Sequence, residues 1–518
     1  MVRGSILKTA KEAAGTSTCK KVFVTLSKLA LVAGLLAAPL AAQAEEKAAP
    51  AAATAPAAAT APAPAAAPAP AAAPAAATAP AAASAATAAA PAPKNVDPVL
   101  NTGDTAWMLV SSALVLFMIP GLALFYGGMV RSKNVLSTIM HSFVAMGIVG
   151  VQWAVIGYTL SFGPDMGHGL IGNFSKAMMN GLITFKDGNP VFALFQNVAT
   201  EPGSIPEYVF AMYQCMFAMI TVALISGALA ERIKFSTYCV FVLLWTTLVY
   251  DPLAHWVWMA DGWLCKMGAL DFAGGTVVHL SSGISALVVL YFLGKRHGFP
   301  HERMAPHSLP LTLAGVGILW FGWFGFNAGS AIVGLNTSDA AGGLAGLAMA
   351  TTTIAPAAAG LTWMIAEWIH AGKPSALGFG SGVVAGLVVI TPAAGFVQPG
   401  AAILMGIAGG LVCYMGVMMK AKFKYDDSLD AFGVHGVGGT TGAILTGVFA
   451  TVGATGLTSG NMKQFVTQLI AVGAAAAYAV IVTFVISFVL SKTMGFRVEK
   501  EDEIIGLDQT QHSESAYN

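Results

Sequence analysis

The chain has 518 residues, of which 56% are hydrophobic and only 10% are charged, and its mean hydropathy is +0.71. Soluble domains contain about 25% charged residues, so the composition excludes an ordinary soluble protein and predicts one embedded in a lipid bilayer. The net charge is only +1, and no basic tract is interleaved with aromatic residues, so nucleic acid is not expected as a partner.

Residues 1–44 have the pattern of a secretory signal peptide. Lys20, Lys21 and Lys28 lie before the apolar run 29–40, and the small residues AQA at 42–44 form a typical cleavage site. An uncleaved anchor is the alternative, although the run is shorter than the roughly 20 residues that cross a bilayer. Residues 45–100 consist largely of Ala, Pro and Thr, which predicts an extended or partly helical periplasmic tether.

Residues 101–494 contain eleven apolar segments that are long enough to cross a bilayer as helices of about 20 residues. They lie near 105–127, 135–161, 208–229, 236–256, 273–294, 309–329, 342–369, 376–394, 398–419, 433–453 and 464–491. An outside start then places the tail, residues 495–518, in the cytoplasm. Cytoplasmic loops collect Lys and Arg, and the predicted inner loops and tail hold fourteen of them against five outside. We therefore predict an all-α, multi-pass protein of the bacterial inner membrane.

Spans one to five and six to ten form two halves, followed by a final helix. Because five is odd, the second half is inverted relative to the first, as in many transporters. Two intramembrane histidines fit this plan, since His279 and His435 each lie eight residues after an aspartate, Asp271 and Asp427. About 12 Å of helix separates each histidine from its aspartate. With span five descending and span ten rising, we expect the two rings to approach each other near the midplane.

An ionisable side chain in hydrocarbon is costly and is therefore a candidate functional residue. A lone histidine of this kind can instead be a core residue satisfied by backbone carbonyls, but the matched pair favours a shared pore. Two histidines without a third His, Cys or carboxylate leave a zinc ion short of ligands, so neither a metal nor another cofactor is expected. Asp271 and Asp427 can cap the helices that follow them, and for Asp427 we favour this structural role.

Several segments resemble, in order, the signatures of the ammonium transporters of the Amt/Mep/Rh family. They are PGLALFYGG at 120–128, GALAER at 227–232, DFAGGTVVH at 271–279, GWFGFNAGS at 322–330 and FGVHG at 432–436. The resemblance covers about residues 105–518 and is strongest to bacterial Amt-type members. It implies a homotrimer in which each subunit has its own eleven-helix pore, with no nucleotide or metal.

The resemblance also implies roles for single residues in binding the cation and in lining the pore. The substrate-binding positions are Trp258, Phe217, Ser330 and Asp271, and the pore positions are His279, His435, Phe326, Trp323 and Gln214. Among these, Phe217 and Phe326 resemble the stacked gate, and the two histidines resemble the twin-histidine pair. The tail resembles the cytoplasmic tail of bacterial members, which implies regulation by a PII-type signalling protein.

Ammonium and potassium are similar in size and charge, so a route that requires the ion to shed a proton separates them well. We therefore expect ammonium to be recruited by cation–π attraction, deprotonated, and passed as ammonia along the histidines. The alternatives are an ammonium sensor that acts through a cytoplasmic partner and a gas channel for ammonia or carbon dioxide. An intramembrane hydrolase would need a nucleophile and an oxyanion site that the sequence does not offer, so no enzyme activity is expected.

Overall fold

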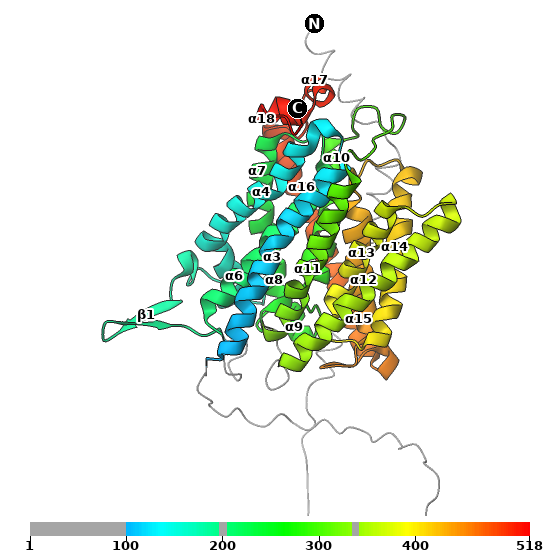
Figure 1. Ribbon diagram of the computed structural model, residues 1–518. Helices are drawn as coiled ribbons and strands as arrows, with labels where there is room; N and C mark the ends of the chain where they lie inside the picture. The colour runs from blue at the N-terminus through cyan, green and yellow to red at the C-terminus, as the bar shows by residue number, and fades with distance from the viewer. Residues whose placement is uncertain (1–99, 196–204, 334–340, 518) are drawn as a thin grey trace, which may run out of the picture.

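The computed structural model describes residues 100–195, 205–333 and 341–517. The predicted signal peptide and, apart from Leu100, the predicted tether lie outside the described residues. The described chain is a bundle of long helices (Figure 1), and all eleven predicted spans are helical. Ten of these helical segments are long and apolar enough to cross a membrane. The remaining one is the predicted tenth span, in which a π-helical turn is followed by a glycine-rich helix.

The eleven spans comprise one or more helical elements each, in chain order. They are α3 (Thr102–Met129); α4 (Val135–Gln152) with η2 (Trp153–Gly157) and α5 (Tyr158–Phe162); α6 (Glu207–Leu229); α7 (Phe235–Trp245) with η4 (Thr246–Tyr250) and α8 (Asp251–Trp258); η5 (Gly275–Leu280) with α10 (Ser281–Leu293); α11 (Leu309–Val333); α12 (Ala341–Ala371); α13 (Ala376–Ile390) with η6 (Thr391–Ala393); α14 (Pro399–Phe423); η7 (Phe432–Gly436) with α15 (Val437–Phe449); and α16 (Met462–Thr493). Short elements η1 (Ser132–Asn134), α9 (Trp263–Met267) and η8 (Leu457–Ser459) lie between them.

The first spans of the two halves, α3 and α11, pack closely because glycines face each crossing point. A Cβ on Gly121 would lie 2.7 Å from Ile318, and one on Gly315 would lie 2.4 Å from the backbone of Phe125. Small residues let membrane helices approach in this way. Spans in equivalent positions of the two halves therefore pack against each other, as expected for an inverted repeat.

Four spans contain a π-helical turn, namely η2, η4, η5 and η7. Such turns are rare and are frequent at functional sites. Two of them, η5 and η7, carry His279 and His435. The sequence did not predict this local widening of the helix.

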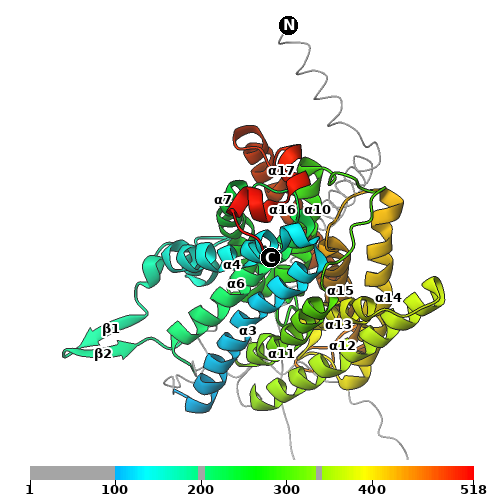
Figure 2. The ribbon, with the colours of Figure 1, turned by 45° about the horizontal axis from the view of Figure 1, so that its top comes forward.

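The only strands among the described residues form an arm between α5 and α6, which we define as residues 163–195. It contains η3 (Ala177–Met179) and an antiparallel hairpin of β1 (Ile183–Lys186) and β2 (Asn189–Phe192). The hairpin projects sideways from the bundle (Figure 2). Sequence analysis predicted an all-α chain, and this hairpin is its one exception.

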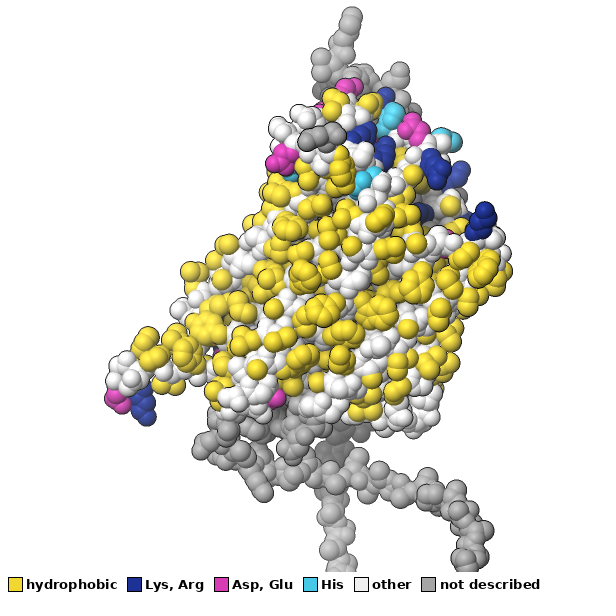
Figure 3. Space-filling view, in the orientation of Figure 1, with side chains coloured by type: hydrophobic (Ala, Val, Ile, Leu, Met, Phe, Trp, Pro, Cys, Tyr) yellow, Lys and Arg dark blue, Asp and Glu magenta, His cyan; other side chains and the backbone are white. Residues whose placement is uncertain are grey.

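The two ends of the bundle differ in charge. The tail forms α17 (Lys500–Ile505) and α18 (Leu507–His512) at one end, which we call the C face. Lys, Arg and His side chains gather at this end, while the sides of the bundle are largely hydrophobic (Figure 3). An apolar belt below a basic end is the pattern of a membrane-spanning domain.

Candidate pore and its mouth

His279 and His435 meet inside the bundle, as the sequence predicted. Their Nδ1 atoms lie 3.2 Å apart, and the rings are nearly parallel, with centroids 5.3 Å apart and an interplanar angle of 22°. Both side chains are buried. In such a contact one nitrogen donates and the other accepts, so at least one of the two imidazoles is neutral.

Two glycines explain why the two spans cross at the histidines. Gly283 and Gly439 each lie four residues after a histidine. A Cβ on Gly283 would lie 2.0 Å from the backbone nitrogen of Gly436, and one on Gly439 would lie 2.6 Å from the backbone nitrogen of Leu280. The contacts are therefore reciprocal, because each glycine accommodates the backbone next to the other span's histidine.

Asp271 and Asp427 cap the two spans that carry the histidines. Asp271 accepts hydrogen bonds from the backbone nitrogens of Gly274 at 2.7 Å, Gly275 at 2.6 Å and Thr276 at 2.8 Å, and another from the Thr276 hydroxyl. Asp427 accepts from the backbone nitrogens of Ala431 at 3.1 Å and Phe432 at 2.8 Å. The preferred capping role of Asp427 is therefore confirmed, and Asp271 also acts as a cap.

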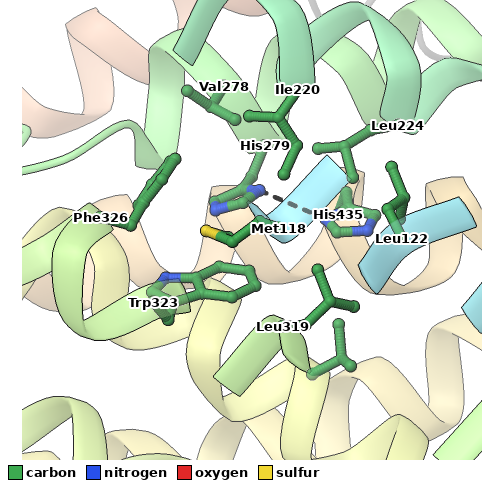
Figure 4. Close-up of a pocket in the computed structure, with 11 residues that line it drawn as sticks. Met118, Leu122, Ile220, Leu224, Val278, His279, Leu319, Trp323, Phe326 and His435 are labelled. Atoms are coloured by element: carbon green, nitrogen blue, oxygen red, sulfur yellow. Dashed lines mark hydrogen bonds between the residues drawn. The ribbon is translucent and has the colours of Figure 1, made fainter. Parts of the chain in front are cut away.

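The histidine pair opens onto a narrow cavity between the two halves (Figure 4). Its other lining residues are nine apolar side chains: Met118, Leu122, Ile220, Leu224, Val278, Leu319, Trp323, Phe326 and Val384. Nε2 of His279 is buried without a hydrogen-bond partner. The cavity thus combines an unpartnered imidazole nitrogen with walls that would not stabilise a bare cation.

A continuous row of aromatic side chains, each in contact with the next, extends from one end of this cavity toward the face opposite the C face. Trp258 contacts Phe217 edge-on at 6.0 Å, and Phe217 stacks on Phe326 at 4.0 Å with an interplanar angle of 16°. Phe326 in turn lies 6.2 Å from the His279 ring. The predicted gate residues are therefore stacked, and they separate Trp258 from the histidines.

Trp258 and Trp323 are each held by a hydrogen bond from the indole nitrogen. Trp258 Nε1 donates to the backbone oxygen of Asp271 at 2.9 Å, so the capping aspartate also positions the tryptophan at the mouth. Trp323 stacks on His279, with ring centroids 5.5 Å apart, and its Nε1 donates to the Thr391 hydroxyl at 2.8 Å. Both rings are thereby fixed in orientation.

Ser330 and Gln214 lie buried near the gate. The Ser330 hydroxyl donates to the backbone oxygen of Phe326 at 2.9 Å and lies 3.1 Å from the hydroxyl of Tyr213. The Gln214 side-chain oxygen is buried without a partner. Sequence analysis did not single out Tyr213, which fixes Ser330, although it lies four residues before Phe217, on the same face of α6.

The apolar lining residues were also missed. Met118 and Leu122, like Ile220 and Leu224, are spaced four apart and share a helix face. In a membrane helix the same spacing serves equally for packing or for lipid contact, so no signal in one sequence distinguishes a pore wall.

Ion pairs tie the spans together at the C face. Glu231 binds Arg131 at 2.7 Å and Arg296 at 3.1 Å, and Arg296 also binds Asp426 at 2.7 Å. Burial raises the pKa of Asp426, but the guanidinium groups of Arg232 and Arg296 outweigh that effect and lower it to about 2. The network is structural.

Within the described residues, no group of three or more His, Cys, Asp or Glu could hold a metal ion.

Comparisons with known proteins identify the family of the chain. The model of the Ammonium Transporter Family matches residues 106–517. An ammonium transporter of Bacillus subtilis is 48% identical over 428 residues, which cover 81% of this chain and 99% of that protein. The ammonium transporter Amt1 of Archaeoglobus fulgidus is 44% identical over 421 residues, which cover 81% of this chain and all of that protein.

The fold of the chain is similar to the folds of solved structures from the same family. The crystal structure of Saccharomyces cerevisiae Mep2 superposes with a TM-score of 0.69 at 35% identity, covering 78% of this chain and 88% of that one. A structure titled Sensor Amt Protein superposes with a TM-score of 0.70 at 28% identity, covering 79% and 98%. The chain therefore belongs to the Ammonium Transporter Family, as its motifs predicted.

Proposed function

We propose that this protein transports ammonium across the bacterial inner membrane by deprotonating it and conducting ammonia past the histidine pair. The observation that carries this proposal is the 3.2 Å contact between His279 and His435 in an otherwise apolar cavity behind the stacked gate. Such a cavity opposes a bare cation, but it offers hydrogen bonds to a neutral molecule that can both donate and accept.

Recruitment takes place at the mouth opposite the C face. An ammonium ion in contact with Trp258 and Phe217 gains cation–π attraction of about 0.5–2 kcal/mol. Ser330 supplies a hydroxyl oxygen that accepts an N–H, because its own hydrogen is directed to the Phe326 carbonyl. Asp271 contributes negative charge behind the site and holds Trp258, but its oxygens are occupied by the backbone of η5. It therefore acts through charge and position rather than as a direct ligand.

Selectivity follows from the gate and the cavity together. Potassium could occupy the aromatic mouth, but it cannot lose a proton and has no hydrogen bond to donate to an imidazole nitrogen. Ammonia accepts from one imidazole and donates to the other. Phe217, Phe326 and Trp323 exclude water around this exchange. Gln214 precedes Phe217 by three residues on α6, and its side-chain oxygen has no partner, but it does not line the cavity.

The test uses the purified protein in proteoliposomes. Equal pulses of ammonium and potassium are applied while transient current and internal pH are recorded, with His279→Ala, His435→Ala and a matched His307→Ala control. His307 lies on the C face and contacts Val130 and Tyr517, away from the cavity. We expect an ammonium-specific signal in the wild type and the control, and loss of selectivity in the pore variants.

The two signals separate the possible modes of transport. The proton that ammonium loses can cross the membrane by a separate route, which gives a current with ammonium but not with potassium. If the proton instead returns to the outer solution, only ammonia crosses, and internal pH rises without a current. Repeating the pH measurement with carbon dioxide tests the second gas. Absence of both signals in correctly inserted protein overturns the proposal of transport.

An ammonium sensor is the second candidate, and the structural similarity to the protein titled Sensor Amt Protein favours considering it. A sensor would bind ammonium and change its contacts with a cytoplasmic partner without flux. Binding of ammonium in proteoliposomes that show neither current nor pH change would favour this function over transport.

The remaining features of the proposal concern topology and assembly. We propose that residues 1–44 are a signal peptide, that 45–100 are a periplasmic tether, and that the membrane domain 101–494 precedes a cytoplasmic tail at 495–518. The C face is then cytoplasmic and the arm is periplasmic. We also propose a homotrimer, with a PII-type signalling protein as partner at the C face.

A further inference from the structure

The last span, α16, belongs to neither half of the repeat, yet it packs against both. It contacts η5 and α10 of the first half and α15 of the second. Of the residues that line the cavity at the histidines, none comes from α16. Gln468, in its second turn, is nevertheless fully buried. A buried amide in a membrane-spanning helix is costly unless its polar atoms are satisfied, so its partners indicate its role.

Gln468 binds both backbone groups of one residue in the loop before η5. Its Oε1 accepts from the backbone nitrogen of Leu270 at 2.7 Å, and its Nε2 donates to the backbone oxygen of Leu270 at 2.8 Å. The second Nε2 hydrogen is donated to the backbone oxygen of Ala443, on α15, at 3.0 Å. A carbonyl only accepts and a backbone N–H only donates, so these partners fix the orientation of the amide. Gln468 thus ties the loop to the span that carries His435.

The residue that Gln468 holds directly precedes Asp271. The Trp258 indole nitrogen donates to the backbone oxygen of Asp271 at 2.9 Å, and the Asp271 carboxylate caps η5. Within the described residues, the Leu270 backbone has no hydrogen bonds other than those to Gln468. The oxygen of Leu270 belongs to the planar peptide unit that leads into Asp271. Fixing that plane therefore restricts where the acceptor for Trp258 lies.

We propose that Gln468 is a positioning residue for ammonium recruitment, which fixes the Trp258 ring at the mouth through Leu270 and Asp271. Without its amide, the peptide unit before Asp271 can rotate, and Trp258 loses the fixed acceptor that orients it. Gln468 itself does not touch the ion. This inference rests on the proposed recruitment of ammonium at Trp258 and names the side chain that holds that site in place.

The first experiment compares Gln468→Met with Gln464→Met in the full chain in proteoliposomes. Methionine removes the amide but keeps the Cβ and Cγ atoms that pack on Gly447. Gln464 is the matched control, because it lies one turn earlier on α16 and donates instead to the backbone oxygen of Gly268 at 2.9 Å. The ammonium-specific signal is measured over a concentration series, and the amount of correctly inserted protein is measured in parallel.

We expect the half-saturation concentration of ammonium to rise about 2- to 30-fold in Gln468→Met, the range that corresponds to cation–π attraction at the mouth. The maximal signal per inserted protein should be retained, and Gln464→Met should match the wild type. A purely structural role would lower the maximal signal and leave the half-saturation concentration unchanged, which overturns the proposal. An equal rise in Gln464→Met assigns the effect to the whole start of α16 and also overturns it.

A double-variant cycle tests whether Gln468 acts through Trp258. Trp258→Leu alone should raise the half-saturation concentration, and adding Gln468→Met should raise it no further. If the two increases multiply, Gln468 acts by another route and the proposal is wrong. If Trp258→Leu alone has no effect, ammonium is not recruited at that ring, and the inference fails together with that step of the proposed function.

Hydrogen exchange of the full chain in detergent, without ammonium, tests the loop directly. The backbone N–H groups of residues 270 and 274–276 should exchange at least about tenfold faster in Gln468→Met than in the wild type, and at the wild-type rate in Gln464→Met. Unchanged exchange in Gln468→Met contradicts the proposal. If the wild type itself gives no ammonium-specific signal, the transport proposal fails, whereas exchange still decides whether Gln468 holds the loop.

Discussion

At the scale of single residues, the contact between His279 and His435 restricts where protons lie. In one arrangement His435 donates through Nδ1, so the Nε2 of His435 carries no hydrogen and the Nε2 of His279 carries one. In the other arrangement His279 donates through Nδ1, and the Nε2 hydrogen is on His435. Either arrangement presents one donor and one acceptor along the pair. Ammonia that passes the pair therefore meets one imidazole nitrogen that donates a hydrogen bond and one that accepts. Moving the protons from one arrangement to the other reverses the order in which ammonia meets them.

Trp323 should control the orientation of His279, because it stacks on that ring and is itself held by Thr391. Thr391→Val keeps the shape but leaves the indole N–H buried without a partner, at a cost of about 1–3 kcal/mol. We expect a lower melting temperature and a several-fold lower ammonium flux in proteoliposomes. Thr312→Val is the matched control, since the Thr312 hydroxyl bonds only within its own helix turn. Equal flux in the two variants would contradict the role of Trp323.

Sequence reasoning reached some residues of the site and not others for physical reasons. His279, His435 and the gate phenylalanines stood out because an ionisable ring in an apolar run is rare and because long motifs matched a family. Met118 and Leu224 did not, since an apolar side chain is favourable in a pore wall, in a helix contact and in lipid alike. Glu231 and Arg232 are adjacent in sequence, but their partners, Arg131, Arg296 and Asp426, come from distant loops.

At the scale of elements, helix boundaries followed from hydrophobicity, but local helix geometry did not. The predicted first span, 105–127, corresponds to α3 at Thr102–Met129. The π-helical turns η5 and η7 depend on how two spans pack across each other. The hydrophobic pattern of a single span does not predict that packing. The hairpin was missed because Ile183–Phe192 is short and has an apolar face that its own chain does not bury.

The crossing of the two histidine-bearing spans should depend on Gly283 and Gly439. Gly283→Ala places a methyl group about where the Gly436 backbone now lies, so the spans must separate and the contact between the imidazoles must lengthen. We expect flux to fall by about tenfold or more, since misplacement by about 1 Å can cost up to about a hundredfold at a reacting centre. Gly147→Ala, whose added Cβ would meet nothing within 4 Å, should retain flux and stability. Retention of flux in Gly283→Ala would contradict this account of the crossing.

At the scale of the whole molecule, the C face joins spans that are distant in sequence through one charge network. Arg296 follows α10 and reaches both Glu231, which follows α6, and Asp426, which follows α14. Arg131 adds the end of α3. Breaking one member leaves buried charge unpaired, so the effect of a substitution there should extend beyond its own loop.

Asp426 gives this network a defined pH dependence. Its pKa is about 2 in the folded protein, against about 4 when unfolded. A lowered pKa of a carboxyl group stabilises the folded state above pH 4, by about 2 kcal/mol here, and this contribution is lost as pH falls from about 4 to 2. Melting temperatures of the wild type and Asp426→Asn in detergent should therefore differ at pH 7 and converge below about pH 2. A difference independent of pH would contradict the assignment.

The tail contacts the C face at several places, and one of them is the first turn of α4. Asp508 accepts hydrogen bonds from the backbone nitrogens of Leu136 at 3.1 Å and Ser137 at 2.8 Å, so a residue near the end of the chain caps the second span. Such a cap contributes about 0.5–2 kcal/mol. Asp508→Ala should therefore raise the population of undocked tail by about 2- to 30-fold, and trypsin should cleave at Arg497 and Lys500 faster by a similar factor.

The matched variant is Asp502→Ala, on α17, whose carboxyl forms no ion pair or hydrogen bond within the described residues. It removes the same charge from the tail without removing the cap, so its cleavage rate should stay near that of the wild type. If both variants are cleaved equally fast, charge rather than capping holds the tail. If only Asp508→Ala is faster, the amino end of α4 is the point at which any partner that binds the tail would compete with the membrane domain.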